Sequence, residues 1–240
     1  MTGDAPAAGR TRSAVVTGAA SGIGRNVATM LLDRGWIVIA TDRDADGLRS
    51  IPDPTADGSG EIRRVAGDLE DLEATTHAIV REVETLPRLD GLANVAGIYD
   101  PLSMGQADTA RFERHLRVNL TAPWLLADLL WEKLANGGRI VNAGSLAAGS
   151  PFPGSVAYTC SKAGLVGLTN VLHASGRKAG IEAHCINFGW VDTPLVSDDA
   201  KSRATTTLDP ESAAAEIARL LCGGGSPRGA VSYPMGAGGT

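Results

Sequence analysis

The sequence has little of what several large classes of protein require. Its 240 residues contain only three cysteines, Cys160, Cys185 and Cys222, so we predict neither a disulfide framework nor a metal site. No apolar run approaches the ~18 residues that a membrane span needs. The formal net charge is −5 and no Lys/Arg cluster occurs. We therefore expect no membrane and no nucleic-acid partner, because a phosphate backbone requires a basic surface.

The rest of the composition is that of a soluble globular protein. Apolar residues make up 43% and charged residues 20%, which is ordinary for such chains, and a chain of this length can bury a large core. The opening stretch, MTGDAPAAGRTR, has no apolar segment long enough for a signal peptide. We predict a disordered tail over residues 1–12, a single domain over 13–240, reduced thiols and a cytoplasmic location.

Apolar stretches of two kinds alternate along the chain. Short runs rich in Val, Ile and Ala predict seven strands, and longer stretches with apolar residues at helical intervals predict helices between them. The predicted strands are SAVVTGA, WIVIATD, EIRRVAGD, LDGLANVAG, GRIVNAGS, IEAHCINFG and GAVSYPMG; the predicted helices include NVATMLLDRG, LEATTHAIVREVETL, APWLLADLLWEKL, VAYTCSKAGLVGLTNVLHASG and PESAAAEIARLL. This alternation predicts an α/β Rossmann fold, a doubly wound parallel seven-stranded sheet with helices on both faces. Ligands of such folds bind at the carboxyl ends of the strands.

A glycine-rich segment, TGAASGIG, follows the first predicted strand. Gly18 permits a tight turn, Gly22 lets backbone N–H groups approach a pyrophosphate, and Gly24 lets the next helix pack closely. The helix N-terminus adds positive potential. We predict a dinucleotide phosphate site that also includes Ser21 and Ile23. A plain glycine turn is the alternative, because such turns are common.

Two charged residues at the end of the second predicted strand bear on the choice of dinucleotide. The carboxylate of Asp42 can accept hydrogen bonds from an adenosine ribose 2′-hydroxyl and would repel a 2′-phosphate. We therefore predict that NAD(H) is favoured over NADP(H). Arg43 works in the other direction, because a guanidinium there can pair with a 2′-phosphate. An exposed charge at the end of a strand remains the simpler alternative for Asp42.

Taken with motifs further along, these residues resemble the short-chain dehydrogenase/reductase family over nearly the whole chain. The motifs occur in the family's order: TGAASGIG, GDL with Asp68, NVAG at 94–97, VNL with Asn119, IVNAGS ending at Ser145, a Tyr-x-x-x-Lys pair, and INFGWVDTP at 186–194. Three features depart from the family pattern. The acidic residue that usually precedes the last glycine pair is missing in PMGAGG, and two further positions carry a different residue. Val95 stands where a second asparagine is usual, and Phe188 stands where a proline is usual.

The resemblance implies a role for each matching residue. Asp68 and Leu69 would contact the adenine. Asn94, Ala96 and Gly97 would line the adenosine ribose and stabilise the central strand, and Val191 and Thr193 would hold the nicotinamide carboxamide. The implied catalytic residues are Asn119, Ser145, Tyr158 and Lys162, and the last two would also contact the cofactor. Ser145 would hold the substrate oxygen beside the Tyr158 hydroxyl, and Asn119 would anchor a water in a proton path from Lys162.

The spacing of Tyr158 and Lys162 has its own physical interpretation. Residues i and i+4 of a helix lie on one face, with Cβ atoms about 5–6 Å apart. A free phenol titrates near ~10, and a neighbouring ammonium stabilises the phenolate. At an effective dielectric of ~20, a unit charge ~5 Å away is worth roughly 3 kcal/mol, or about two pKa units. We therefore predict that Lys162 lowers the pKa of Tyr158 and that Tyr158 acts as the general acid/base.

The substrate end of the chain is less specific. The stretch from about 194 to 210 is predicted to be a short polar lid. Aromatic and apolar walls are predicted from Tyr99, Leu146, Phe152, Phe188 and Trp190. These favour a small or cyclic secondary alcohol or its ketone. The helix APWLLADLLWEKL is apolar over much of its circumference, which predicts a homo-oligomer, a dimer or a tetramer.

Three functions are compatible with these observations. The first is an NAD-dependent dehydrogenase that transfers a hydride between a secondary alcohol and the nicotinamide. The second is an NADPH-dependent ketoreductase, such as a 3-oxoacyl-carrier-protein reductase, against which Asp42 argues. The third is a non-catalytic nucleotide-binding protein on the same fold, against which the complete set of four catalytic residues argues. His77, His115, His173 and His184 lie outside these motifs and are predicted to be surface or packing residues.

Overall fold

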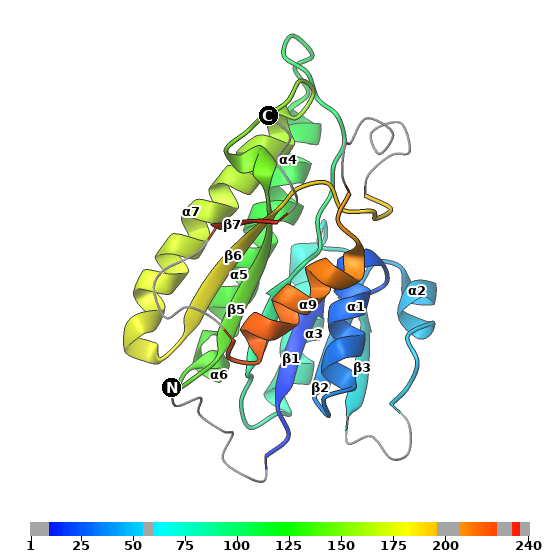
Figure 1. Cartoon of the computed structure of the whole chain (residues 1–240), viewed down its shortest axis with the longest axis vertical. Coiled ribbons are helices and arrows are strands. Elements are labelled where there is room, and N and C mark those ends of the chain that lie inside the picture. The colour runs from blue at the N-terminus through cyan, green and yellow to red at the C-terminus, as the bar shows by residue number, and fades with distance from the viewer. Residues whose placement is uncertain (1–9, 55–59, 196–206, 225–231, 236–240) are drawn as a thin grey trace.

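The computed structural model describes residues 10–54, 60–195, 207–224 and 232–235. Strands and helices alternate through them as the apolar pattern predicts (Figure 1). The strands are β1 (Ser13–Thr17), β2 (Ile37–Asp42), β3 (Glu61–Ala66), β4 (Gly91–Asn94), β5 (Arg139–Ser145), β6 (Glu182–Phe188) and β7 (Ser232–Met235).

The seven strands form one sheet in the order β3-β2-β1-β4-β5-β6-β7, and every neighbouring pair is parallel. The predicted fold is confirmed: this is a single-domain Rossmann-type sheet. The strand order reverses between β1 and β4, because β2 and β3 lie on one side of β1 while β4 to β7 lie on the other. In sheets of this kind the ligand crevice lies at that reversal, beyond the carboxyl ends of the strands.

Helices cover both faces of the sheet. One face carries α1 (Gly22–Leu32), α2 (Ala45–Arg49) and α9 (Pro210–Leu221), and Figure 1 shows α1 and α9 beside one another. The other face carries α3 (Leu72–Glu84), α5 (Ala122–Leu129), α6 (Trp131–Leu134) and α7 (Val156–Ala179). Burial on both faces explains why the strands are continuous apolar runs rather than alternating ones.

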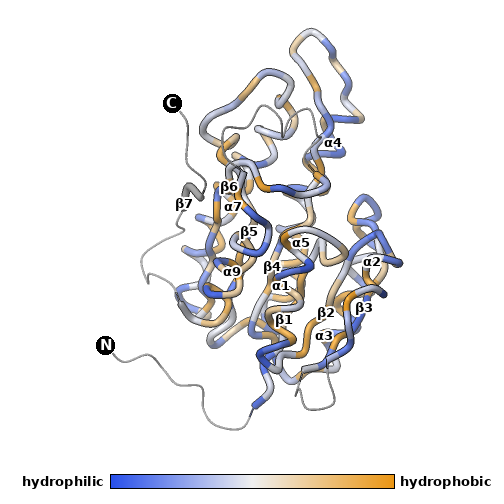
Figure 2. Tube along the Cα trace, turned by 45° about the vertical axis from the view of Figure 1, so that its right-hand side comes forward, coloured by the Kyte–Doolittle hydropathy of each residue, from blue (hydrophilic) through white to orange (hydrophobic). Residues whose placement is uncertain are grey.

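The core is divided into two parts by the sheet. On β1, Ala14 and Val16 pack against α1 and α9, while Val15 packs against α3 and α5, because successive side chains of a strand point to opposite faces. All three side chains are fully buried. Figure 2 shows hydrophobic colour along β1 and β2 in the interior and hydrophilic colour on α2 and α4 at the periphery.

One long helical stretch was only partly expected from the sequence. It begins with α4 (Thr109–Leu116), continues through a π-helical turn, η1 (Arg117–Thr121), and passes into α5. The prediction began this helix at Ala122 and missed the first part, because TARFERHL is mostly polar. Its N-cap was a usable signal: the side chain of Asp108 accepts a hydrogen bond from the Arg111 N–H at 3.0 Å. A short 3-10 turn, η2 (Leu146–Ala148), follows β5.

Residues 10–12, which the sequence assigns to a disordered N-terminal tail over 1–12, make defined contacts with the rest of the fold. The first nine residues lie outside the described part of the chain. Arg10 makes two hydrogen bonds, of 2.5 and 3.0 Å, with the carboxylate of Asp90. The guanidinium of Arg12 lies 5.5 Å from the ring centroid of Trp36. These cation contacts attach residues 10–12 to the sheet.

Among the described residues, none of the helices combines the length and apolar character needed to cross a bilayer. The same residues contain no group of three or more His, Cys, Asp or Glu side chains that could hold a metal ion.

Candidate active site

The glycine-rich turn between β1 and α1 has a backbone that only glycine tolerates easily. Gly18 and Gly22 have φ values of +70° and +51°, in the left-handed region. A Cβ added to Gly24 would lie 2.1 Å from the carbonyl oxygen of Gly18. The first turn of α1 therefore packs directly against the end of β1, as the glycine spacing predicts.

The N-terminus of α1 is open to an anion. Ser21 occupies the N-cap position, but its side chain makes no capping hydrogen bond, and the first turn contains no acidic residue. The backbone N–H groups of such a turn carry partial positive charge. These features fit a pyrophosphate, and the backbone of Gly22, Ile23 and Gly24 would hold it.

Thr17 joins this turn to the neighbouring strand. Its hydroxyl accepts hydrogen bonds from the N–H groups of Val95 and Ala96 at 3.0 and 3.1 Å and donates one to the Ala93 carbonyl at 3.4 Å. A Cβ on Gly18 would lie 2.8 Å from the Ala96 backbone. Sequence reasoning missed this residue. A buried threonine directly before the first glycine of the motif was the available signal.

A cavity of about 430 Å³ lies along the carboxyl ends of β1 to β4, a size typical of small-molecule sites. Twelve of the predicted cofactor residues line it: Gly18, Ser21, Gly22, Ile23, Gly24, Asp42, Arg43, Asp68, Leu69, Ala96, Gly97 and Thr193. Tyr99 lines it too. Sequence reasoning missed several other lining residues, including Thr41, Ile98, Asp100, Arg114 and Val118. The other four predicted cofactor residues, Asn94, Tyr158, Lys162 and Val191, are not among the lining residues.

The carboxylate of Asp42 is held in place at the edge of this cavity. One oxygen accepts a hydrogen bond from the Ala20 N–H at 3.1 Å, and the other accepts one from the Asp44 N–H at 3.0 Å. Each oxygen keeps a lone pair for a further donor. The Arg43 side chain, 60% exposed, lies beside it with its guanidinium 4.0 Å from Glu70. Both residues that bear on cofactor choice therefore face the same end of the cavity.

Asp68 lies in a tight turn after β3. Its Oδ1 accepts a hydrogen bond from the Glu70 N–H at 2.9 Å, and its main-chain carbonyl accepts one from the Thr75 hydroxyl at 2.7 Å. Leu69, which is 8% exposed, packs against Val118 and Ala122. The turn thus places a carboxylate and an apolar side chain side by side on the cavity wall.

Tyr158 and Lys162 lie on one face of α7, close to the end of β5. Lys162 is 5% exposed, and its ammonium donates a hydrogen bond of 2.8 Å to the Ala143 carbonyl. The same ammonium lies 5.8 Å from the centroid of the Tyr158 ring. Ser145, from the end of β5, hydrogen-bonds with the Tyr158 side chain and accepts a second hydrogen bond from the Ala147 N–H at 3.2 Å.

The predicted direction of the Tyr158 pKa is wrong. Burial raises the pKa of Tyr158, and the hydrogen bond with Ser145 opposes that effect only in part. Burial also lowers the pKa of Lys162, to about 8. Both shifts have the same cause, because a low-dielectric site disfavours the charged form of each group. Attraction between the two charges alone would lower the pKa of Tyr158, but the desolvation of both groups outweighs it.

Asn119 lies in the π-helical turn η1 and is fully buried. Its Oδ1 accepts a hydrogen bond from the Ile98 N–H at 2.8 Å, and its Nδ2 donates to the Ile98 carbonyl and to the Ser161 hydroxyl, both at 3.0 Å. Ser161 donates in turn to the Tyr158 carbonyl at 2.7 Å. Asn119 thus connects the loop after β4 to α7, and π-helical turns of this kind often occur at functional sites.

Gly97 leaves a space between Asn119 and Lys162. A Cβ added to Gly97 would lie 3.3 Å from Asn119 Oδ1 and 3.5 Å from Lys162 Nζ. A position with an acceptor on one side and an ammonium on the other suits a small polar molecule such as water. The predicted water in a path from Lys162 is compatible with this arrangement, and it remains a prediction.

Asn94 belongs to a buried network behind the site. Its Nδ2 donates a hydrogen bond of 2.8 Å to Asn142 Oδ1, and Asn142 Nδ2 donates one of 2.8 Å to the Thr169 hydroxyl. The network joins β4 and β5 to α7. The expected stabilisation of the central strand by Asn94 therefore has a structural basis, whereas a contact with the ribose does not follow from its position.

Four aromatic rings form a row that ends at Tyr158. The rings of Tyr158 and Tyr99 meet edge to face, with centroids 5.3 Å apart. Phe152 follows at 6.0 Å from Tyr99, and Trp190 at 5.9 Å from Phe152. Trp190 is 36% exposed. Such contacts are favourable geometries for aromatic pairs, and they bring Tyr99, Phe152 and Trp190 together as the sequence predicts.

The other two residues predicted for the pocket wall have different positions. Leu146 is half-buried in η2, one residue after Ser145. Phe188 is 4% exposed and packs in the core beside α9, so the prediction that it lines the pocket is wrong. Because β6 is covered on both faces, the side chain of its last residue is directed into the core.

Val191 and Thr193 lie at the start of the predicted lid. Val191 forms an isolated β-bridge with Leu208, and the Leu208 N–H donates to the Trp190 carbonyl at 2.7 Å. The two ends of the lid are thus joined to each other, while residues 196–206 lie outside the described part of the chain. A Cβ added to Gly22 would lie 3.1 Å from Thr193, which places Thr193 directly beside the glycine-rich turn.

His115 is predicted to be a surface or packing residue, and in the structure it also makes specific hydrogen bonds to the main chain. It is fully buried, and its Nε2 accepts a hydrogen bond from the Asp100 N–H at 3.0 Å while its Nδ1 lies 2.8 Å from the Arg111 carbonyl. This fixes the loop that carries Tyr99. Cys160, in contrast, is exposed on α7.

Comparison with known proteins bears on the family of this chain. The family model described as short chain dehydrogenase matches residues 12–204. Oxidoreductase UcpA of Salmonella typhimurium is 30% identical over 88% of this chain and 80% of its own. Cis-4-hydroxycyclohexanecarboxylate dehydrogenase of Sinomonas cyclohexanicum is 32% identical over 81% and 79%. A crystal structure of a short chain dehydrogenase from Burkholderia cenocepacia J2315, in complex with NADP, superposes with a TM-score of 0.83 at 26% identity, covering 93% of this chain and 96% of the other.

Those three proteins match along most of their own lengths, and the family model spans the glycine-rich turn, the cavity and the Tyr158–Lys162 pair. With the fold and the geometry, these matches decide the family: the chain belongs to the short-chain dehydrogenases.

Proposed function

We propose that the protein is an NAD-dependent dehydrogenase that transfers a hydride between a secondary alcohol and the nicotinamide. The observation that carries the proposal is the position of Tyr158, which hydrogen-bonds with Ser145 beside the buried ammonium of Lys162. A phenol placed in this way can exchange a proton with a substrate oxygen. The family and its named relatives are oxidoreductases; the direction, the substrate and the choice of dinucleotide are the proposal.

Each catalytic side chain has one task in this proposal. Tyr158 takes the hydroxyl proton of the alcohol or returns a proton to the ketone. Ser145 holds the substrate oxygen next to Tyr158. Lys162 stabilises the phenolate, and Asn119 holds α7 against the loop after β4. A bound nicotinamide supplies the hydride chemistry and, in its oxidised form, a positive charge that favours the phenolate.

The preference for NAD rests on Asp42. Its carboxylate is already oriented by two backbone N–H groups and would repel a 2′-phosphate. The NADPH-dependent ketoreductase is the second candidate, because Arg43 lines the same cavity and a structural neighbour was solved with NADP. Values of KM for both dinucleotides separate the two, since a lower KM for NADP(H) contradicts the first. The non-catalytic alternative requires dinucleotide binding without turnover of any alcohol.

The aromatic row supports a small or cyclic substrate. Tyr99, Phe152 and Trp190 extend away from the Tyr158 ring, and flat apolar surfaces suit a ring better than a polar chain. We expect cyclic secondary alcohols, such as hydroxycyclohexanes, to be oxidised faster than open-chain polyols. The test is a panel of both classes with NAD, followed by NADH absorbance. Equal rates for polyols would remove the cyclic preference, and no turnover in the panel would contradict the dehydrogenase.

The pH dependence of ketone reduction follows from the two shifted pKa values. Reduction requires a protonated Tyr158, whose pKa is raised, and a charged Lys162, whose pKa is about 8. Both are in the required form below about pH 8. As the pH rises through this value Lys162 loses its charge, so we expect kcat/KM for reduction to fall by up to about tenfold per pH unit. A Lys162→Met variant should show a low rate without this descending limb. If it keeps the limb, another group is responsible.

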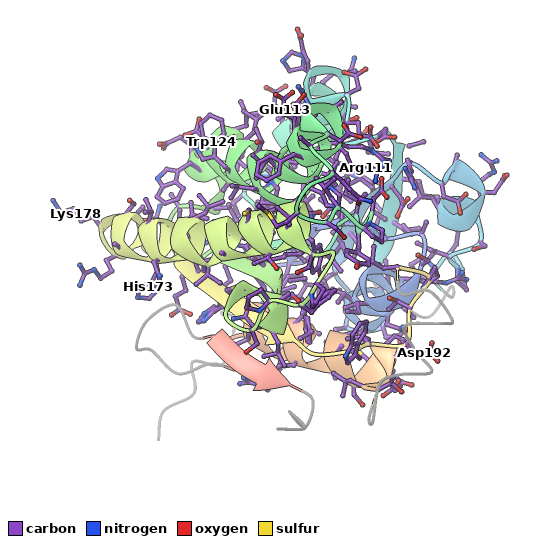
Figure 3. All side chains as sticks on the ribbon, turned by 90° about the horizontal axis from the view of Figure 1, so that it is seen from above. Arg111, Glu113, Trp124, His173, Lys178 and Asp192 are labelled. Carbon is purple, nitrogen blue, oxygen red and sulfur yellow. The ribbon has the colours of Figure 1, made fainter. Side chains whose placement is uncertain are left out.

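We also propose that the chain forms a homo-oligomer in the cytoplasm. Trp124 and Leu129 on α5 and Val171 on α7 are 48%, 43% and 62% exposed, and Figure 3 shows Trp124 projecting outward beside α7. Together these large apolar side chains suit a contact between copies. Sedimentation analysis of the purified protein measures its mass, and a monomer at all concentrations would contradict the oligomer.

The three cysteines are free, which suits a reducing compartment.

A further inference from the structure

Glu70 and Arg114 lie at the end of the cavity formed by Asp42, Arg43 and Asp68, and neither has a task in the proposed function. Glu70 lies in the turn between β3 and α3 and forms an ion pair with Arg114 of α4. The Nε and Nη2 atoms of Arg114 both lie 2.6 Å from Glu70 Oε1. The two side chains are 35% and 36% exposed. Short charge-assisted contacts at this degree of burial hold both partners in position.

A second guanidinium lies close to the same carboxylate oxygen. Arg43 Nη1 is 4.0 Å from Glu70 Oε1. Arg43 and Arg114 both line the cavity, together with Asp42 and Asp68, while Glu70 lies just outside its lining. One carboxylate is therefore shared by the two cations that a dinucleotide would meet at this end.

We propose that Glu70 is a residue that determines cofactor selectivity. A 2′-phosphate binds where guanidinium groups are free to pair with it. Glu70 neutralises Arg114 and competes with a bound phosphate for Arg43. A 2′-phosphate would therefore be repelled by Asp42 without full compensation from either guanidinium. The ribose 2′-hydroxyl of NAD is uncharged and needs no cation, so Glu70 does not lower the affinity for NAD. The choice of NAD then depends on Glu70 as well as on Asp42. This inference rests on the proposed function, because it assumes that the cavity binds a nicotinamide dinucleotide.

The chemistry predicts opposite effects for the two partners of this pair. Glu70→Gln keeps a hydrogen-bonding side chain of the same size but removes the negative charge, which leaves both guanidinium groups to the phosphate. Arg114→Gln removes one cation, so that Arg43 becomes the only guanidinium of this pair that can interact with Glu70. The first variant should shift the ratio of dissociation constants toward NADP, by roughly tenfold, and the second should shift it toward NAD. Both effects should shrink at high salt, because these side chains are partly exposed.

The experiment measures Kd for NAD and for NADP by calorimetry with the full chain at low and at high salt. Glu73→Gln is the matched control: Glu73 is an exposed carboxylate in the first turn of α3, so its loss changes the net charge equally. The double variant Glu70→Gln, Arg43→Gln tests the route, because it should lose most of the gain in NADP affinity.

The expected result is a shift toward NADP in Glu70→Gln, the opposite shift in Arg114→Gln, and an unchanged ratio in Glu73→Gln. Equal changes of both affinities in Glu70→Gln would overturn the inference, and so would the same shift in Glu73→Gln. These outcomes leave the proposed function intact. If the unaltered chain binds neither dinucleotide, the proposed function itself fails.

Discussion

Replacing Tyr158 by phenylalanine is expected to lower kcat for alcohol oxidation by about 10³-fold while leaving dinucleotide affinity within about twofold. The substitution removes one hydroxyl, and the ring keeps its edge-to-face contact with Tyr99 at 5.3 Å. The variant should therefore fold, yet have no group that can exchange a proton with the substrate oxygen. Turnover is measured as NADH formation, and affinity by calorimetry with NAD.

Tyr99→Phe is the matched control for this substitution. It removes the same atom from the neighbouring ring, which also lines the cavity. Burial raises the pKa of Tyr99 as it does that of Tyr158, but the charged neighbour that acts on Tyr99 is the carboxylate of Asp100, which raises the pKa further. Tyr158 instead has the Lys162 ammonium 5.8 Å from its ring centroid, and of these two charges only the cation stabilises a phenolate. We expect a change in kcat of less than about tenfold. If Tyr158→Phe retains more than a few per cent of the original turnover, or if Tyr99→Phe loses as much, Tyr158 is not the acid/base.

The second large effect is expected from Gly24→Ala. The added Cβ would lie 2.1 Å from the Gly18 carbonyl oxygen and 3.1 Å from the Thr17 oxygen. Both are main-chain atoms of the same turn, so the turn must move to admit the methyl group. Overpacking of this kind costs about 1–3 kcal/mol, which lowers Tm by roughly 2–12 °C for a chain of this size. A displaced turn should also weaken NAD binding by at least about 100-fold.

Gly149→Ala is the comparison for this second variant. Gly149 is exposed, and an added Cβ would meet no atom within 4 Å. We expect its Tm and its Kd for NAD to stay close to those of the unaltered protein. Thermal unfolding and calorimetry give both quantities for the two variants. An unchanged Kd in Gly24→Ala would show that the close approach of α1 to β1 is not needed to hold a dinucleotide.

Local patterns predicted much of the architecture correctly. The continuous apolar runs of β1, β2 and β5 identify strands buried on both faces, and the stretch from Val156 identifies α7. The segment before Ala122 was missed, because α4 is polar in composition and its continuity with α5 depends on the π-helical turn at Asn119. That turn is stabilised by hydrogen bonds to Ile98 and Ser161, which are distant in sequence.

The candidate site was also predictable only in part from the sequence. Glycine spacing was sufficient to place the turn before α1, because positive φ and close packing select glycine at each position. The wall of the pocket was not predictable in the same way. Phe188 is one of three phenylalanines and lies within the INFGWVDTP motif, but the pleat of β6 directs it into the core. Glu70 and Arg114 carry no motif, and only the packing of α4 against the turn after β3 brings them together.

The sequence by itself determined the family, the parallel sheet and the residues gathered at its carboxyl edge, since these follow from short-range periodicity and from residue types with specific backbone geometry. Only the tertiary structure decided the electrostatics of that edge. Desolvation depends on every atom that surrounds a group, so burial reversed the expected pKa direction of Tyr158 and brought Lys162 to a pKa of about 8. The contact of Glu70 with two arginines, one of them from a distant helix, has the same origin.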